Sequence, residues 1–202
     1  MKLRKILLKK SLLCLILDRQ GFIRLPFDGV GIIQLRDKVS DKRHVLSLAI
    51  KLARILSKTK TLFIVNDYID LALICGADGV HLGQDDIPLK AARKILGKSK
   101  IIGISCHNLR QALKAQKEGA DYIGIGPIYE TATKPGVKSI GLNPLRQLKD
   151  KIKIPYFAIG NIHEDNIKEI TAAGATRIAV CRGILKADNP KRAARGLFNK
   201  LK

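Results

Sequence analysis

The chain is poor in aromatic residues: it has no tryptophan, four tyrosines and five phenylalanines, together 4% of the sequence. Proteins that bind single-stranded nucleic acid combine basic side chains with aromatic ones on which bases stack. This chain has many basic residues but no cluster in which aromatics interleave with them. We therefore expect no nucleic-acid partner. A basic nucleic-acid-binding protein is kept only as an alternative to an enzyme.

Acidic residues are also scarce. The sequence has 17 Asp and Glu against 38 Lys and Arg, which gives a formal net charge of +21. Such a field attracts nucleic acid, anionic membranes and phosphorylated metabolites alike, so charge alone does not choose among them. Because basic residues such as Lys51, Lys90 and Lys168 are dispersed along helical segments, we interpret most of this charge as a solvated outer surface.

Closely spaced cysteines and long apolar runs are absent. The four cysteines, at positions 14, 75, 106 and 181, are too far apart for a CxxC motif, which predicts a reduced cytoplasmic chain without a disulfide. The basic and then apolar amino terminus resembles a signal peptide, but its apolar run covers only residues 12–17 and no small-residue cleavage site follows. We expect a first strand there, with neither export nor a membrane span.

Short apolar runs do recur through the whole sequence, each followed by a longer stretch with helical spacing. We predict strands at 12–17, 31–35, 62–65, 79–82, 101–104, 122–125, 155–159 and 177–180. The predicted helices are 41–57, 69–75, 88–96, 109–118, 143–149, 164–173 and 190–201, and the first connection is expected to be short. This alternation is typical of repeated βα units with a parallel sheet.

The number of units favours one closed fold. A length of 202 residues suits a single domain, and nearly continuous apolar strands predict a sheet covered on both faces. A doubly wound open sheet would also fit, but no GxGxxG follows the first strand. We therefore predict a single (β/α)8 TIM barrel over residues 1–202, with its active site at the carboxyl ends of the strands.

Cationic side chains follow the second predicted strand. Side chains alternate along a strand, so Gln34, Arg36 and Lys38 are expected to share one face while Asp37 takes the other. A forked guanidinium beside a compact ammonium suits a diphosphate. A solvated strand end is the simpler interpretation of the same residues.

Acidic residues follow the third and fourth predicted strands. Asp67 and Asp86 should meet at one rim, where oxygen ligands suit Mg²⁺ that also holds a phosphate. Asp85 is an alternative to Asp86, and capping of the next helix is the simpler role for either acid.

The remaining strand ends supply hydroxyls, cations and a long loop. Ser105 and His107 suggest a hydrolase, which the absence of a GxSxG elbow and of a third member argues against. His81 lies within a strand, where a structural role is the commoner one. The loop at 124–136 carries Lys134 and is of the kind that closes over substrates. Residues 158–161 and 179–183 end strands seven and eight, where this fold often binds phosphate.

Seven ordered motifs carry a resemblance to a known family. They are QLRDK, VND, DGVHLGQDD, IGIS-H, GADYIGIGPIYETATK, AIGNI and GATRIAV, and in this order and spacing the chain resembles the bacterial thiamine phosphate synthase family from about Leu15 onward. The resemblance implies a barrel transferase that joins (4-amino-2-methyl-5-pyrimidinyl)methyl diphosphate to thiazole phosphate. The products would be thiamine phosphate and pyrophosphate, and the expected cofactor is Mg²⁺.

The resemblance also implies roles for individual residues. The metal ligands would be Asp67 and Asp86, and the pyrimidine diphosphate would contact Gln34, Arg36, Lys38, Asn66, Ser105 and Lys134. The thiazole phosphate would be held by Thr131, Ala132 and Thr133 together with Asn161, Cys181 and Arg182. Arg36, Lys38, Ser105 and Lys134 would be catalytic, because the chemistry implied is loss of diphosphate to give a pyrimidine cation, which the thiazole nitrogen captures. A homo-oligomer is possible.

Two positions depart from the family pattern. Asn161 stands where members read glycine in IGGI, and Arg182 stands where many carry serine. Asn tolerates a positive φ better than other non-glycine residues, and a cation is compatible with phosphate. The related thiazole tautomerase, which needs no metal, is the nearest alternative, and the retention of Asp67, Asp86 and Lys134 favours the synthase.

Overall fold

Eight parallel strands close into a barrel in the computed structural model, which describes residues 2–19, 21, 25–26, 28–131 and 136–202. The strands pair in sequence order and β8 pairs with β1, so the described sheet has no open edge. Their bounds are β1 Leu13–Leu17, β2 Val30–Leu35, β3 Leu62–Asn66, β4 Gly79–Leu82, β5 Ile101–Cys106, β6 Tyr122–Ile125, β7 Tyr156–Ile159 and β8 Ile178–Val180. The predicted TIM barrel is confirmed, and all eight predicted strands are present.

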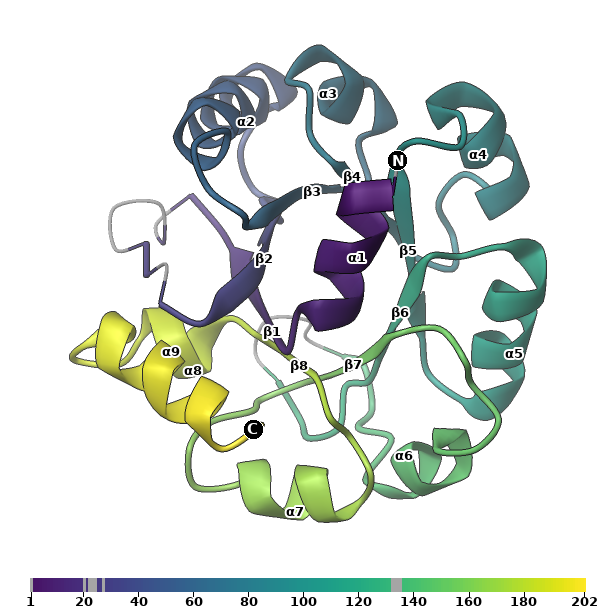
Figure 1. Ribbon diagram of the computed structural model, residues 1–202, viewed down its shortest axis with the longest axis vertical. Coiled ribbons are helices and arrows are strands. Elements are labelled where there is room, and N and C mark those ends of the chain that lie inside the picture. Colours follow the sequence, from purple (N-terminus) through teal and green to yellow (C-terminus); the bar gives the residue numbers. More distant parts are fainter. Residues whose placement is uncertain (1, 20, 22–24, 27, 132–135) are drawn as a thin grey trace.

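Helices surround the barrel (Figure 1). Their bounds are α1 Lys2–Lys10, α2 Lys42–Leu56, α3 Ile69–Ile74, α4 Leu89–Leu96, α5 Leu109–Glu118, α6 Asn143–Leu148, α7 Ile167–Ala172, α8 Arg182–Leu185 and α9 Pro190–Asn199. The seven predicted helices correspond to α2 to α7 and α9. The sequence analysis missed α1 and the four-residue α8.

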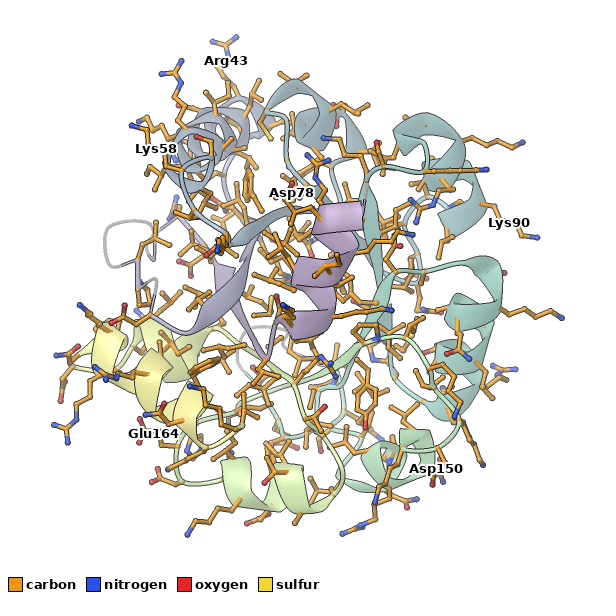
Figure 2. All side chains as sticks on the ribbon, viewed as in Figure 1. Arg43, Lys58, Asp78, Lys90, Asp150 and Glu164 are labelled. Carbon is orange, nitrogen blue, oxygen red and sulfur yellow. The ribbon has the colours of Figure 1, made fainter. Side chains whose placement is uncertain are left out.

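Local sequence explains where these helices begin and which face they bury. Asp41 caps α2 by accepting a hydrogen bond from the backbone N of His44 at 2.8 Å, and Asn108 caps α5 in the same way. The buried residues of α2 recur at helical spacing and form the stripe that faces the sheet: Val45, Leu48, Ala49, Leu52 and Leu56. Basic side chains lie on the outer surface, and Figure 2 shows Arg43, Lys58 and Lys90 projecting away from the barrel. This arrangement agrees with the predicted solvated outer surface.

The amino ends of the strands are covered by α1, which lies across that end of the barrel (Figure 1). Its Leu8 is buried against the inward-facing side chains of the barrel. Arg4 pairs with Asp78, and Lys5 pairs with Asp121 at 3.0 Å. Because α1 covers the barrel interior at the amino ends of the strands, that interior is accessible from their carboxyl ends.

The sequence Gly-Ala-Asp occurs twice, at residues 76–78 and 119–121, and has a structural explanation. Gly119 ends α5 in the left-handed region, with φ 92°, and the turn then places Asp121 at the start of β6. Asp121 accepts a hydrogen bond from the backbone N of Ile102 at 2.9 Å, and Asp78 accepts one from the backbone N of Phe63 at 3.0 Å. Each phrase therefore stops a helix and ties the next strand to its neighbour.

No helix in the described part of the chain is both long enough and apolar enough to cross a membrane. The cysteines in this part are free thiols.

Candidate active site

A cavity of about 580 Å³ opens at the carboxyl ends of the strands. Its walls include every proposed site residue that the structure describes: Gln34, Arg36, Lys38, Asn66, Asp67, Asp86, Ser105, Thr131, Asn161, Cys181 and Arg182. Ala132, Thr133 and Lys134 lie outside the described residues. Residues chosen from seven separate segments of the sequence thus line one cavity of ligand size.

The end of β2 presents its side chains as the alternation predicts. Gln34 and Arg36 line the cavity with Lys38, while Asp37 is buried and accepts hydrogen bonds from the backbone N of Val39 and of Ser40, each at 3.0 Å. Asp37 therefore holds the turn that carries the two cations.

Lys38, which follows β2, forms an ion pair with Asp67, which follows the neighbouring strand β3, and both residues line the cavity. Asp67 follows β3 in the left-handed region, with φ 64°, and its backbone N donates to the carbonyl of His81 at 2.9 Å. Burial, together with the nearby carboxyl of Asp86, raises the pKa of Asp67, although Lys38 opposes the shift. The site therefore disfavours the negative charge of Asp67 when no further cation is present.

Asp86, and not its neighbour Asp85, is the partner of Asp67. The Asp86 carboxylate interacts with Asp67 and also accepts a hydrogen bond from the backbone N of Gly83 at 2.6 Å. Neither acid caps α4, because the N-cap position is Pro88 and makes no side-chain cap bond.

Ser105 is joined to a histidine, but not to the one adjacent in sequence. Its Oγ lies 2.9 Å from Nε2 of His81, whereas His107 bonds through Nδ1 to the carbonyl of Gly126. Nδ1 of His81 lies 3.0 Å from the hydroxyl of Tyr122. The suggested pairing of Ser105 with His107 is therefore not formed.

The turn after β7 contains the substituted glycine position. Asn161 has φ 49°, as its tolerance of positive φ allows, and Gly160 before it has φ 117°. A Cβ on Gly160 would lie 2.6 Å from the backbone N of Ile128, so this glycine permits the close approach of two loops.

Cations and a thiol line the wall after β8. Arg182 begins α8, and both Arg36 and Arg182 act on the thiol of Cys181. Burial nevertheless raises the pKa of Cys181 to about 11, so the thiol stays protonated at neutral pH. Positive charge from two strand ends is thus concentrated on this side of the cavity.

Tyr122, Gln84 and Glu130 line the cavity although the sequence analysis did not mark them as site residues, and His81, which was expected to be structural, lines it too. Tyr122 and His81 form its buried floor, and Gln84 donates to the carbonyl of Ser105 at 2.6 Å. The single glycines Gly103 in β5 and Gly124 in β6 were the available signal for Tyr122 and His81, since glycine inside a strand marks close approach by another group.

The carboxylate pair is suited to a hard divalent cation. Among the described residues, no group of three or more His, Cys, Asp and Glu is placed to hold a metal ion. Asp67 and Asp86 can supply two oxygen ligands, and Mg²⁺ commonly takes one or two carboxylates, with phosphate and water completing its coordination. Their mutual repulsion is relieved by a cation, so the donor set fits Mg²⁺ brought together with a diphosphate.

Comparison with protein families gives one match that spans most of the chain. The family model described as thiamine monophosphate synthase matches residues 24–184. The thiamine-phosphate synthase of Shouchella clausii is 48% identical over 171 residues, 84% of this chain and 82% of the relative. That of Gloeobacter violaceus is 46% identical over 173 residues, which are 86% of this chain; the matched part spans about half of that relative, 51%.

Solved structures agree with the fold. Thiamine phosphate pyrophosphorylase from Pyrococcus furiosus superposes with a TM-score of 0.82 at 31% identity, covering 95% of this chain and 97% of that one. A 3-hexulose-6-phosphate synthase superposes with a TM-score of 0.69 at 19% identity, covering 93% of this chain and 98% of that one, and shares the fold alone.

Proposed function

The chain belongs to the thiamine monophosphate synthase family, and we propose that it transfers a pyrimidinylmethyl group to thiazole phosphate. The substrates would be (4-amino-2-methyl-5-pyrimidinyl)methyl diphosphate and thiazole phosphate, and the products thiamine phosphate and pyrophosphate. The observation that carries the proposal is the pair of Asp67 and Asp86 beside Lys38 in the mouth of the cavity. The cytoplasmic location and a homo-oligomeric state stay predictions.

The two carboxylates and the cations of the site have different proposed roles. Asp67 and Asp86 would hold Mg²⁺, which when bound would draw charge from the diphosphate oxygens. Lys38 and Arg36 would bind the same diphosphate, the first as a compact charge and the second as a planar fork. Lys134, outside the described residues, is proposed to add a third cation.

Loss of the diphosphate would leave a pyrimidine cation, which the electron-rich aminopyrimidine ring can delocalise. Fixed positive charge from Lys38 and Arg36 favours this step because it stabilises the negative charge that develops on the leaving group. No protein nucleophile is needed. The chain's main task would be to orient the thiazole nitrogen toward the cation and to keep water away from it.

The thiazole phosphate would bind at the ends of β7 and β8. Arg182 offers a guanidinium there, and the turn at Gly160 and Asn161 brings backbone close to the cavity. Thr131 and Cys181 line the same region and are proposed contacts, with Ala132 and Thr133 from the same loop.

The experiment is formation of thiamine phosphate and pyrophosphate by purified protein with both substrates, in Mg²⁺ or in EDTA. We expect Mg²⁺-dependent formation of both products, and its loss in Asp67→Asn. Asp70→Asn is the matched control, because Asp70 forms an ion pair with Lys42 outside the cavity lining. Absence of thiamine phosphate under every metal condition would refute the synthase and make thiazole isomerisation the next reaction to test.

A further inference from the structure

A connected chain of polar groups lines the floor of the cavity. Gln34 and His81 are 4% and 7% exposed and belong to the few buried polar side chains of the described residues. Tyr122, 2% exposed, has its hydroxyl 3.0 Å from Nδ1 of His81, and the side chain of Gln34 also acts on that hydroxyl. Nε2 of His81 continues the chain to Oγ of Ser105 at 2.9 Å. The four residues come from four different strands, β2, β4, β5 and β6.

The neighbouring strands leave space for this chain of groups. A Cβ on Gly103 would lie 2.2 Å from Cζ of Tyr122, and a Cβ on Gly124 would lie 3.3 Å from Cε1 of His81. Gly103 pairs in register with His81, and Gly124 pairs with Ser105. Any side chain at Gly103 would therefore displace the tyrosine, which indicates that the barrel interior is built around these rings.

We propose that Tyr122 and His81 are positioning residues that fix which atoms of Gln34 and Ser105 act as donors and acceptors toward the pyrimidine substrate. This inference rests on the proposed function, and it concerns two residues that have no direct role in the proposed chemistry. They act through the side chains of Gln34 and Ser105.

The direction of the hydrogen bonds follows from acidity. Burial raises the pKa of Tyr122 well above 10, so its hydroxyl keeps its proton. A neutral imidazole has one donor and one acceptor nitrogen. A phenol is a stronger donor than an aliphatic alcohol, so Tyr122 donates to Nδ1 of His81. The proton of His81 is then on Nε2, which donates to Oγ of Ser105.

Both ends of the chain of groups are thereby defined. Because Oγ of Ser105 accepts from His81, its own proton is directed to another acceptor, and Ser105 serves as a donor rather than as an activated nucleophile. At the other end, the Tyr122 hydroxyl uses its proton in the hydrogen bond to His81, so its oxygen can only act as an acceptor toward an N–H of Gln34, in agreement with the effect of Gln34 in lowering the Tyr122 pKa. The amide oxygen and second N–H of Gln34 are then available to read an amino group beside a ring nitrogen, the pattern by which Gln reads adenine.

The tautomer of His81 tests this polarity without any substrate. The chain has four histidines, so ¹⁵N-resolved NMR spectra of the imidazoles can be assigned by comparison with His81→Gln. We expect a neutral ring protonated on Nε2 and bare on Nδ1, and loss of this preference in Tyr122→Phe. A ring protonated on Nδ1, or a doubly protonated ring, would overturn the inference.

Kinetics test the consequence for the substrate. We expect Tyr122→Phe and His81→Leu to lower kcat/KM for the pyrimidine diphosphate about tenfold, the effect of one hydrogen bond, with KM for thiazole phosphate unchanged. His81→Gln should recover part of the loss because it keeps a donor and an acceptor. Tyr156→Phe is the matched control: it removes a tyrosine hydroxyl bonded at 2.8 Å to the carbonyl of Gly174 outside the cavity lining.

The outcomes separate the two claims. If Tyr122→Phe has the same kinetics as Tyr156→Phe, or if kcat/KM falls equally for both substrates, the positioning role is wrong while the synthase proposal stands. If the wild-type protein forms no thiamine phosphate, the proposed function fails, and the NMR result still decides the polarity of the hydrogen bonds.

Discussion

The two ends of the barrel hold their carboxylates in opposite ways. At the amino ends of the strands, Asp121 bonds to Arg93 at 2.6 Å, to Lys5 at 3.0 Å and to a backbone N–H. At the carboxyl ends, Asp67 and Asp86 lie against each other, and the pKa of Asp67 is raised. The first arrangement satisfies its charge within the protein, whereas the second leaves a cation to be supplied by a ligand.

The difference separates stability from function. The Asp121 side chain is 8% exposed and fully paired, so its removal would leave buried partners unsatisfied and destabilise the folded chain. Two crowded carboxylates destabilise it, which is common where a site is arranged for ligand binding rather than for folding. Substitutions at the carboxyl ends should therefore lower activity without lowering stability. Substitutions at the amino ends should lower stability without lowering activity.

The largest effect is expected on activity at the carboxyl end. Lys38→Ala should lower kcat about 100- to 1000-fold, because it removes a fixed charge from the leaving diphosphate. Steady-state kinetics would measure it, with Lys42→Ala as the control, since Lys42 forms a similar ion pair with Asp70 outside the cavity lining. Equal activity of the two variants would contradict the proposed role of Lys38.

At the amino end the expected loss is in stability. Asp121→Ala should lower the free energy of unfolding by about 3 kcal/mol, because it leaves Arg93 without its carboxylate and Ile102 without an acceptor. Urea unfolding would measure the change, and kcat/KM should stay at the wild-type value. Exposed Asp150→Ala is the control, with an expected change within about 0.5 kcal/mol. A loss of activity without loss of stability would break the division between the two ends.

Asp67→Asn should stabilise the metal-free protein by about 1 kcal/mol while it abolishes activity. The raised pKa of Asp67 means that the folded state binds this proton more tightly than the unfolded state, whose carboxyl has its ordinary value of 3.8. The gain should be complete above the raised pKa and disappear as the pH falls to 3.8. Thermal unfolding in EDTA across this range would measure it, and a gain that grows on acidification would have the wrong sign.

The smallest effect is expected at Asn161. Asn161→Gly should leave kcat/KM at least at the wild-type level, because glycine adopts φ 49° without strain. Asn161→Ala should lower the free energy of unfolding by about 1 kcal/mol, the cost of the left-handed region for alanine. A lower KM for thiazole phosphate in Asn161→Gly would show that the asparagine side chain hinders the phosphate.

Periodicity predicted the fold because the strands are short and apolar and because a helix follows each of β2 to β8. Residues 2–10 were not predicted as a helix because the segment is strongly basic. In the folded chain, α1 is stabilised by ion pairs with Asp78 and Asp121. The short α8 has too few residues for any helical period to be visible.

For the site, strand alternation predicted the shared face of Gln34, Arg36 and Lys38. Alternation within one strand cannot identify which side chain on another strand is its hydrogen-bond partner. The bond between His81 and Ser105 joins neighbouring strands and depends on register, so sequence proximity wrongly suggested His107 instead. Tyr122 was not predicted for a different reason: a buried tyrosine in an apolar strand cannot be told from an ordinary core residue.

Binding of the ligands between Asp67, Asp86 and Arg182, at the carboxyl ends of the strands, is the prediction on which the proposed function depends most. A crystal structure of the protein with Mg²⁺, thiamine phosphate and pyrophosphate tests it most directly. We predict the metal on Asp67 and Asp86, the pyrophosphate beside Lys38 and the phosphate of the product near Arg182. Ligands bound elsewhere, or a metal that contacts neither carboxylate, would contradict the account.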